Sequence, residues 1–162
     1  MAKFRQIKGC KKISSTIIPS ESDLTFLVME FGNGIMTNKK NITVLIVDDE
    51  PDIVELMEEE FKYFGFETAT ALCGDDAIKV LDNKKIDIVV SDFKMPNGNG
   101  MSVLNHVKKM NKPPHFYFVS GQADLSVNDA LTAGARRFFS KPFDLDGLIK
   151  DIETDVKSLG LI

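Results

Sequence analysis

Short apolar runs alternate with amphipathic segments from residue 42 to the end of the chain. Apolar runs bounded by turn residues are typical of strands that are buried on both faces, and apolar residues at helical spacing predict helices. The pattern predicts strands over 42–47, 66–71, 86–91, 115–119 and 136–139. It predicts one helix from Pro51 to a stop at Gly65, and others over 75–82, 101–110, 124–133 and 144–159.

This order is one strand followed by one helix, repeated five times. Such strands form a parallel sheet, and right-handed crossovers place helices on both of its faces. The sequence therefore predicts an α/β protein, a doubly wound (βα)5 fold with a five-stranded parallel sheet.

Polar side chains follow four of the predicted strands. They are Asp48 and Asp49, Asp92, Ser120 and Lys141. Ligand groups gather at the carboxyl ends of the strands in such sheets, so these side chains should meet at one edge. Three carboxylates, a hydroxyl and an amine form a set that can bind a divalent cation and handle a phosphoryl group.

The carboxylates each have an alternative interpretation when taken alone. Asp48 and Asp49 repel one another, so a cation such as Mg²⁺ would neutralise them, but they could instead be a solvated acidic turn before a helix. Asp92 could be a turn-former or a nucleophile toward phosphorus, which would give an aspartyl phosphate.

Ser120 and Lys141 are also weak signals alone. The Ser120 hydroxyl could bond a phosphoryl oxygen, or belong only to a turn with Gly121. Lys141 could offset the charge of phosphoryl oxygens, although a single lysine is usually solvent-exposed. Their shared placement at strand ends favours a common site.

The charge and composition of the chain argue against several classes of function. Residues 1–40 carry seven basic residues against three acidic ones, which leaves 13 basic and 21 acidic residues on 41–162. This acidic body argues against a surface that binds nucleic acid. No apolar stretch approaches the roughly 20 residues that span a bilayer. Cys10 and Cys73 match no zinc or redox spacing. We therefore expect a soluble cytoplasmic protein.

The first 40 residues differ from the remainder in pattern. We expect a loosely ordered N-terminal extension over 1–40 and a compact domain over 41–162. The extension could instead be a docking arm or a membrane-surface contact. Met36 could also be the true start of the protein, since the compact domain begins shortly after it.

Four short stretches carry a resemblance to a known family. They are VLIVDDE at 44–50, VSDFKMP at 90–96, FVSG at 118–121 and KPF at 141–143. With them the chain resembles the receiver domain of two-component response regulators, over about 42–158. The resemblance implies a flavodoxin-like receiver fold. It also implies that Asp92 accepts a phosphoryl group from a phosphohistidine of a sensor histidine kinase or a histidine phosphotransfer protein.

The resemblance further implies a magnesium site. Asp49 and Asp92 would bind Mg²⁺ directly, Asp48 through water, and Lys94 through its backbone carbonyl. Gly98 stands where the family usually has a larger apolar residue, which predicts a looser loop after Asp92.

The resemblance assigns roles to three other residues. Ser120 would form a hydrogen bond with a phosphoryl oxygen, and Lys141 would form an ion pair with the phosphoryl group. The Lys141–Pro142 peptide bond is often cis in the family. Phe138 would be a switch aromatic. On phosphorylation Ser120 would move toward the phosphoryl group and Phe138 would turn inward. That motion would remodel the face formed by 124–159, where a downstream protein would bind.

These implications favour one function over three others. Because the chain ends at Ile162, we expect a stand-alone regulator that signals by phosphorylation-dependent protein contacts. It would be no enzyme, although it would take part in its own phosphorylation and dephosphorylation. The alternative is a pseudo-receiver, a binding module without phosphoryl switching. A small aspartyl-nucleophile phosphatase usually has a second Asp two residues on, which is missing here, and the first strand lacks the Gly-rich loop of a nucleotide-binding fold.

Overall fold

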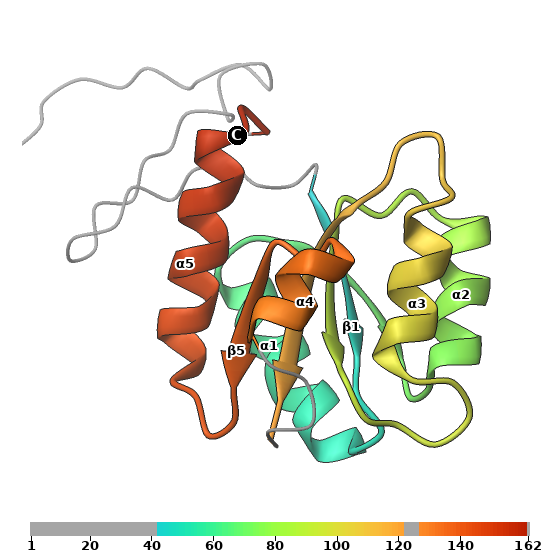
Figure 1. Ribbon diagram of the computed structural model, residues 1–162. Helices are drawn as coiled ribbons and strands as arrows, with labels where there is room; N and C mark the ends of the chain where they lie inside the picture. The colour runs from blue at the N-terminus through green and yellow to red at the C-terminus, as the bar shows by residue number, and fades with distance from the viewer. Residues whose placement is uncertain (1–41, 122–126, 162) are drawn as a thin grey trace, which may run out of the picture. The chain divides into compact units, whose positions relative to one another are not determined.

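The computed structural model describes residues 42–121 and 127–161, in which strands and helices alternate (Figure 1). The strands are β1 (Thr43–Val47), β2 (Glu67–Ala71), β3 (Ile88–Asp92), β4 (His115–Ser120) and β5 (Arg137–Ser140). The helices are α1 (Pro51–Tyr63), α2 (Gly74–Asn83), α3 (Gly100–Val107), α4 (Val127–Ala133) and α5 (Leu145–Ser158).

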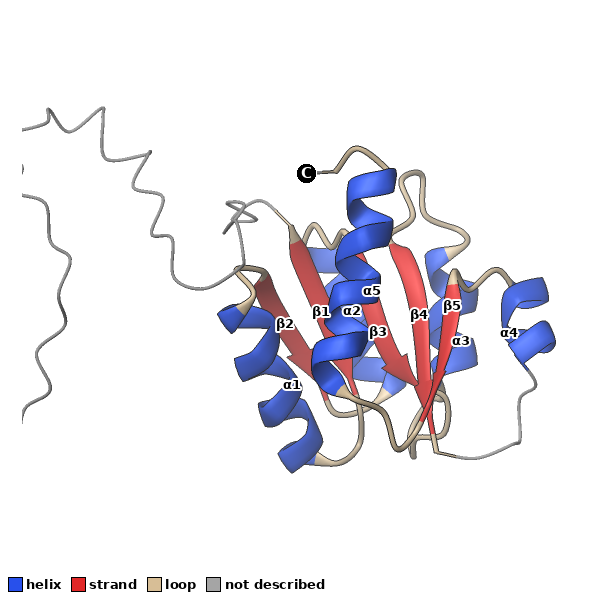
Figure 2. Ribbon diagram, turned by 90° about the vertical axis from the view of Figure 1, so that its left-hand side faces the viewer, coloured by secondary structure: helices blue, strands red, loops and turns tan. Residues whose placement is uncertain are grey.

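The five strands form a single parallel sheet in the order β2-β1-β3-β4-β5. Figure 2 shows α1 and α5 on one face of this sheet and α2 and α3 on the other. The predicted (βα)5 doubly wound fold is confirmed. All strands end at the same edge of the sheet, which we call the carboxyl edge.

The core consists of two apolar layers, one on each face of the sheet. In β1, Val44 and Ile46 pack in the layer with α1 and α5, whereas Leu45 and Val47 pack in the layer with α2 and α3. These four side chains are at most 1% exposed. Strands covered on both faces need apolar residues at every position, and this explains their continuous apolar runs.

Some element boundaries differ from the predicted ones. β3 continues through Asp92 and β4 through Ser120, because these residues pair with Val119 and Ser140 of the neighbouring strands. The helix predicted over 101–110 ends at Val107 and continues as a tighter turn, in which Lys109 N–H donates to the His106 carbonyl. Residues 124–126 of the predicted fourth helix lie outside the described residues.

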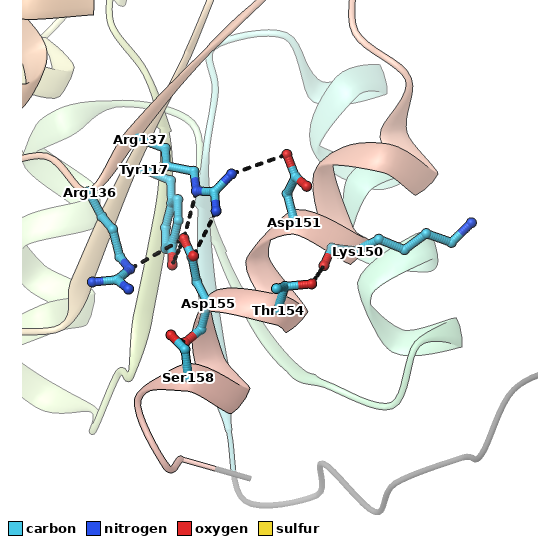
Figure 3. Close-up of polar contacts among 8 residues, drawn as sticks. All are labelled: Tyr117, Arg136, Arg137, Lys150, Asp151, Thr154, Asp155 and Ser158. Atoms are coloured by element: carbon cyan, nitrogen blue, oxygen red, sulfur yellow. Dashed lines mark hydrogen bonds and ion pairs between the residues drawn. The ribbon is translucent and has the colours of Figure 1, made fainter.

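A cluster of hydrogen bonds and ion pairs around Asp155 connects helix α5 to the sheet (Figure 3). The Tyr117 hydroxyl donates to this carboxylate at 3.3 Å, and Arg137 Nε and Nη2 donate to its two oxygens at 2.8 Å each. Arg136 Nε lies 3.3 Å from it, and Arg137 also reaches Asp151 at 3.4 Å. Burial alone would raise the pKa of Asp155, but the hydrogen bonds and charge of Arg137 hold it below its ordinary value.

Several predictions fall on other parts of the chain. The N-terminal extension over 1–40, with Cys10 and the alternative start at Met36, lies outside the described residues. Cys73 is a partly exposed free thiol. Among the described residues, no helix is both long enough and apolar enough to cross a membrane.

Candidate functional site

The structure brings residues from four strands together at the carboxyl edge. Asp48 follows β1, Asp92 ends β3, Ser120 ends β4 and Lys141 follows β5. Lys141 connects three of these positions, because its side chain reaches both aspartates and its backbone N–H donates to the Ser120 carbonyl at 2.7 Å. The predicted meeting of these residues at one edge is therefore observed.

Three carboxylates form a compact acidic cluster there. Asp48, Asp49 and Asp92 each offer an oxygen that lies within 4.8 Å of the others. Asp48 is buried, Asp92 is partly buried and Asp49 is exposed, so the cluster opens to solvent on one side. Carboxylate oxygens are the ligands that Mg²⁺ prefers, and it keeps several waters when only one or two carboxylates bind it. The donor set and its open side fit a magnesium ion.

Lys141 places a positive charge in this cluster. Its Nζ lies 2.7 Å from Asp48 Oδ2 and 3.4 Å from Asp92 Oδ2. The other oxygen of Asp48 accepts the backbone N–H of Glu50 at 3.0 Å. Both oxygens of Asp48 thus have protein partners, which favours the prediction that this residue contacts a metal through water.

The pKa values of Asp92 and Lys141 reflect this arrangement. The pKa of Asp92 is raised, mainly because burial disfavours its charged form; the charge of Lys141 opposes this shift and that of Asp48 adds to it. Burial would lower the pKa of Lys141, but its hydrogen bond to Asp48 and the charges of both aspartates raise it. Ionised Asp92 therefore depends on positive charge nearby.

The segment after Asp92 forms an ordered loop, which we call the β3–α3 loop (residues 93–99). Phe93 N–H donates to Asp92 Oδ1 at 2.6 Å. An open hollow in this loop is lined by Phe93, Lys94, Met95, Pro96 and Asn99. Lys94 is exposed here, one residue beyond Phe93. Its predicted role as a carbonyl ligand stays a prediction.

The β3–α3 loop contacts helix α2 through the backbone of Gly98. The Gly98 carbonyl accepts the N–H of Gly74, at the start of α2, at 2.9 Å. The loop thus has backbone contacts with α2 at this point, and the expectation that Gly98 loosens it stays a prediction. Neither residue type nor spacing in the sequence indicated this contact.

Phe138 lies in β5 opposite Phe118 of β4, and its partly buried ring packs against the apolar layer of α2 and α3. This position is compatible with core packing and with a switch. The Lys141–Pro142 peptide bond is cis, as the resemblance led us to expect.

A family model described as the response regulator receiver domain matches residues 44–153. The chain belongs to this family. Among curated proteins, it is similar to the response regulator SaeR of Staphylococcus epidermidis, with 37% identity over 101 residues. SaeR of Staphylococcus aureus is 38% identical over the same length. Each alignment covers 62% of this chain but 44% of the relative, so the chain spans less than half the length of these relatives.

Solved structures of receiver domains agree with the fold. The receiver domain of the Francisella response regulator 1452 has a TM-score of 0.67 and 27% identity, over 74% of this chain and 99% of that one. The Thermotoga maritima response regulator TrrA, solved in complex with Mg²⁺ and beryllofluoride, has a TM-score of 0.63 and 29% identity, over 70% and 97% of the two chains. Receiver domains are signalling domains of two-component systems, and they typically bind Mg²⁺ at an acidic cluster.

Proposed function

We propose that this receiver domain accepts a phosphoryl group on Asp92 from the phosphohistidine of a sensor histidine kinase or a phosphotransfer protein. The observation that carries the proposal is the position of Lys141, whose Nζ lies within 3.4 Å of both Asp48 and Asp92 inside a cluster of three carboxylates. A nucleophilic carboxylate, a cation site and a fixed amine are the groups that phosphoryl transfer to an aspartate needs.

The transfer exchanges one bond to phosphorus for another. An oxygen of ionised Asp92 forms a bond to phosphorus, while the bond between phosphorus and the imidazole nitrogen breaks and its electron pair stays on that nitrogen. A magnesium ion held by Asp49, Asp92 and the Lys94 carbonyl, and by Asp48 through water, would offset the charge of the phosphoryl oxygens.

Two other side chains complete the proposed site. Lys141 would shift from the aspartates toward a phosphoryl oxygen, since its ammonium group already lies within 3.4 Å of a carboxylate oxygen of both Asp48 and Asp92. The Ser120 hydroxyl, at the end of the adjacent strand, would donate a hydrogen bond to the same group.

The output would be a change in protein contacts. We propose that on phosphorylation Ser120 moves toward the phosphoryl group and Phe138 turns inward. The surface formed by 124–159 then binds a downstream protein. The domain would act in the cytoplasm and would not itself contact nucleic acid, since the acidic balance of 41–162 disfavours binding to phosphate backbones. It would catalyse only its own phosphorylation and dephosphorylation.

The test is intact mass after incubation with Mg²⁺ and a small phosphoryl donor, for the wild type and for Asp92→Asn. One added phosphoryl group on the wild type alone would support Asp92 as the acceptor. Binding of beryllofluoride, a phosphoryl mimic, is measured in parallel in case hydrolysis is faster than detection. No adduct and no beryllofluoride binding would favour the alternative, a pseudo-receiver that binds partners independently of phosphorylation.

A further inference from the structure

Helix α2 begins without a capping side chain of its own. The side chain of the residue before it, Cys73, accepts no backbone N–H of the first turn. Two N–H groups of this turn donate instead to the β3–α3 loop, Gly74 to the Gly98 carbonyl at 2.9 Å and Asp75 to the Asn97 carbonyl at 3.3 Å. The first N–H groups of a helix have no partner within the helix, so the loop after Asp92 serves as the cap of α2.

This cap requires glycine on both sides. A Cβ atom on Gly74 would lie closer to the Gly98 carbonyl oxygen than nonbonded atoms approach. Gly98 has a φ of +88°, and a Cβ there would lie 2.8 Å from Asp75 Oδ1. A side chain at position 74 would therefore push the loop away from the helix, and one at position 98 would strain the turn that makes the contact.

The same loop is fastened at both of its ends. At its start, Phe93 N–H donates to Asp92 Oδ1. At its end, the Asn99 side chain caps α3 by accepting the N–H of Ser102 at 2.9 Å. The contact with α2 is a third attachment between these two, and Lys94 lies in the stretch between the first and the third. A displaced Gly98 would thus change where the Lys94 carbonyl lies relative to Asp92.

We propose that Gly74 and Gly98 are positioning residues of the phosphoacceptor site. Their backbone contact holds the β3–α3 loop in the conformation that presents the Lys94 carbonyl to the cation beside Asp92. This inference rests on the proposed function, because it assumes that the cluster binds Mg²⁺ for phosphoryl transfer.

The test uses the full chain with Gly74→Ala. Groups that orient a metal's ligands typically contribute 10- to 100-fold to its affinity, so Mg²⁺ binding measured by calorimetry should weaken by about tenfold. The phosphorylation rate should fall at low Mg²⁺ and return to within about twofold of the wild type at saturating Mg²⁺, because no reacting group is removed. Hydrogen exchange of the backbone amides of residues 74 and 75 should become faster.

Gly98→Ala is a second variant, in case Gly74→Ala does not fold, and it should weaken Mg²⁺ binding in the same direction. Its matched control is Gly160→Ala, since Gly160 also has a positive φ, +68°, but a Cβ there would meet nothing within 4 Å. This control has the same kind of backbone strain without the contact, and its Mg²⁺ affinity should equal that of the wild type.

Two results would overturn the inference in distinguishable ways. If both glycine variants have a lower melting temperature but bind Mg²⁺ within twofold of the wild type, the contact stabilises α2 and positions nothing. If the wild type itself binds neither Mg²⁺ nor beryllofluoride, the proposed function fails and the inference fails with it.

Discussion

Lys141→Ala should change magnesium binding and phosphorylation in opposite directions. The Lys141 ammonium occupies the acidic cluster and competes with a metal ion for Asp48 and Asp92. At 2.7 and 3.4 Å, and at an effective dielectric constant of about 20, its attraction to these carboxylates is about 6 and about 5 kcal/mol. Desolvation of the buried groups offsets most of this attraction.

Removing the lysine leaves three carboxylates close together without their partner. We expect the variant to lose about 3 kcal/mol of unfolding free energy in magnesium-free buffer, because an uncompensated buried charge is costly. Its Mg²⁺ affinity should rise by about tenfold, or about 1.4 kcal/mol, since the competing ammonium is gone. Phosphorylation should nevertheless slow by about 100-fold, because a fixed positive charge near the phosphoryl oxygens is lost.

Urea unfolding with and without Mg²⁺ gives the stabilities, calorimetry gives the affinity, and intact mass over time gives the rate. The control is Lys150→Ala, whose exposed ammonium lies 3.9 Å from Asp146 Oδ2 on α5. All three quantities should stay at wild-type values in this control. Unchanged or weaker Mg²⁺ binding in Lys141→Ala would refute the idea that the lysine competes with the metal.

Three further variants test the electrostatics of the structure. Asp92→Asn should be more stable than the wild type in magnesium-free buffer at pH 7. The folded-state pKa of Asp92 is raised, so its ionisation costs stability as the pH rises, and the difference should vanish below the unfolded pKa of about 3.9. A series of urea titrations from pH 3 to pH 7 measures this, and a constant difference would contradict it. Asp155→Ala should cost about 3 kcal/mol by removing the carboxylate that accepts two hydrogen bonds from Arg137 and one from the buried Tyr117 hydroxyl, whereas Asp151→Ala should cost at most about 0.5 kcal/mol. The folded-state pKa of Asp155 is lowered, so the stability that its carboxylate contributes is fully present above the unfolded pKa of about 3.9 and is lost as the pH falls through the folded-state pKa. Equal losses of stability in Asp155→Ala and Asp151→Ala would contradict the assignment of the cluster.

The sequence predicted the parts of this structure that depend on local pattern. Strands buried on both faces are visible as apolar runs, and parallel topology then brings Asp48, Asp92 and Lys141 to one edge. The end of β3 was predicted one residue early because Asp92 is polar, whereas its backbone still pairs with Val119 of β4. Polarity decides where an apolar run ends, but hydrogen bonds decide where a strand ends.

Contacts between segments that are far apart in the chain produce no pattern that can be recognised in the sequence. Asp155 and Arg137 are 18 residues apart, and their pairing depends on how α5 lies across β5. The Gly74–Gly98 contact depends on the path of a loop, and glycines at those positions are equally compatible with ordinary turns. Helical spacing and apolar periodicity carry no information about either contact.

The order of the strands in the sheet also determines which parts of the protein can fold while the chain is being synthesised on the ribosome. Strand β1 pairs with β3, so the central pair of the sheet cannot form until the whole of β2 and α2 has been synthesised. Lys141 follows Asp48 by 93 positions and Asp92 by 49. A nascent chain therefore exposes its carboxylates and its apolar β1 and β3 runs well before the lysine is available, in the interval when incomplete chains are most prone to aggregate.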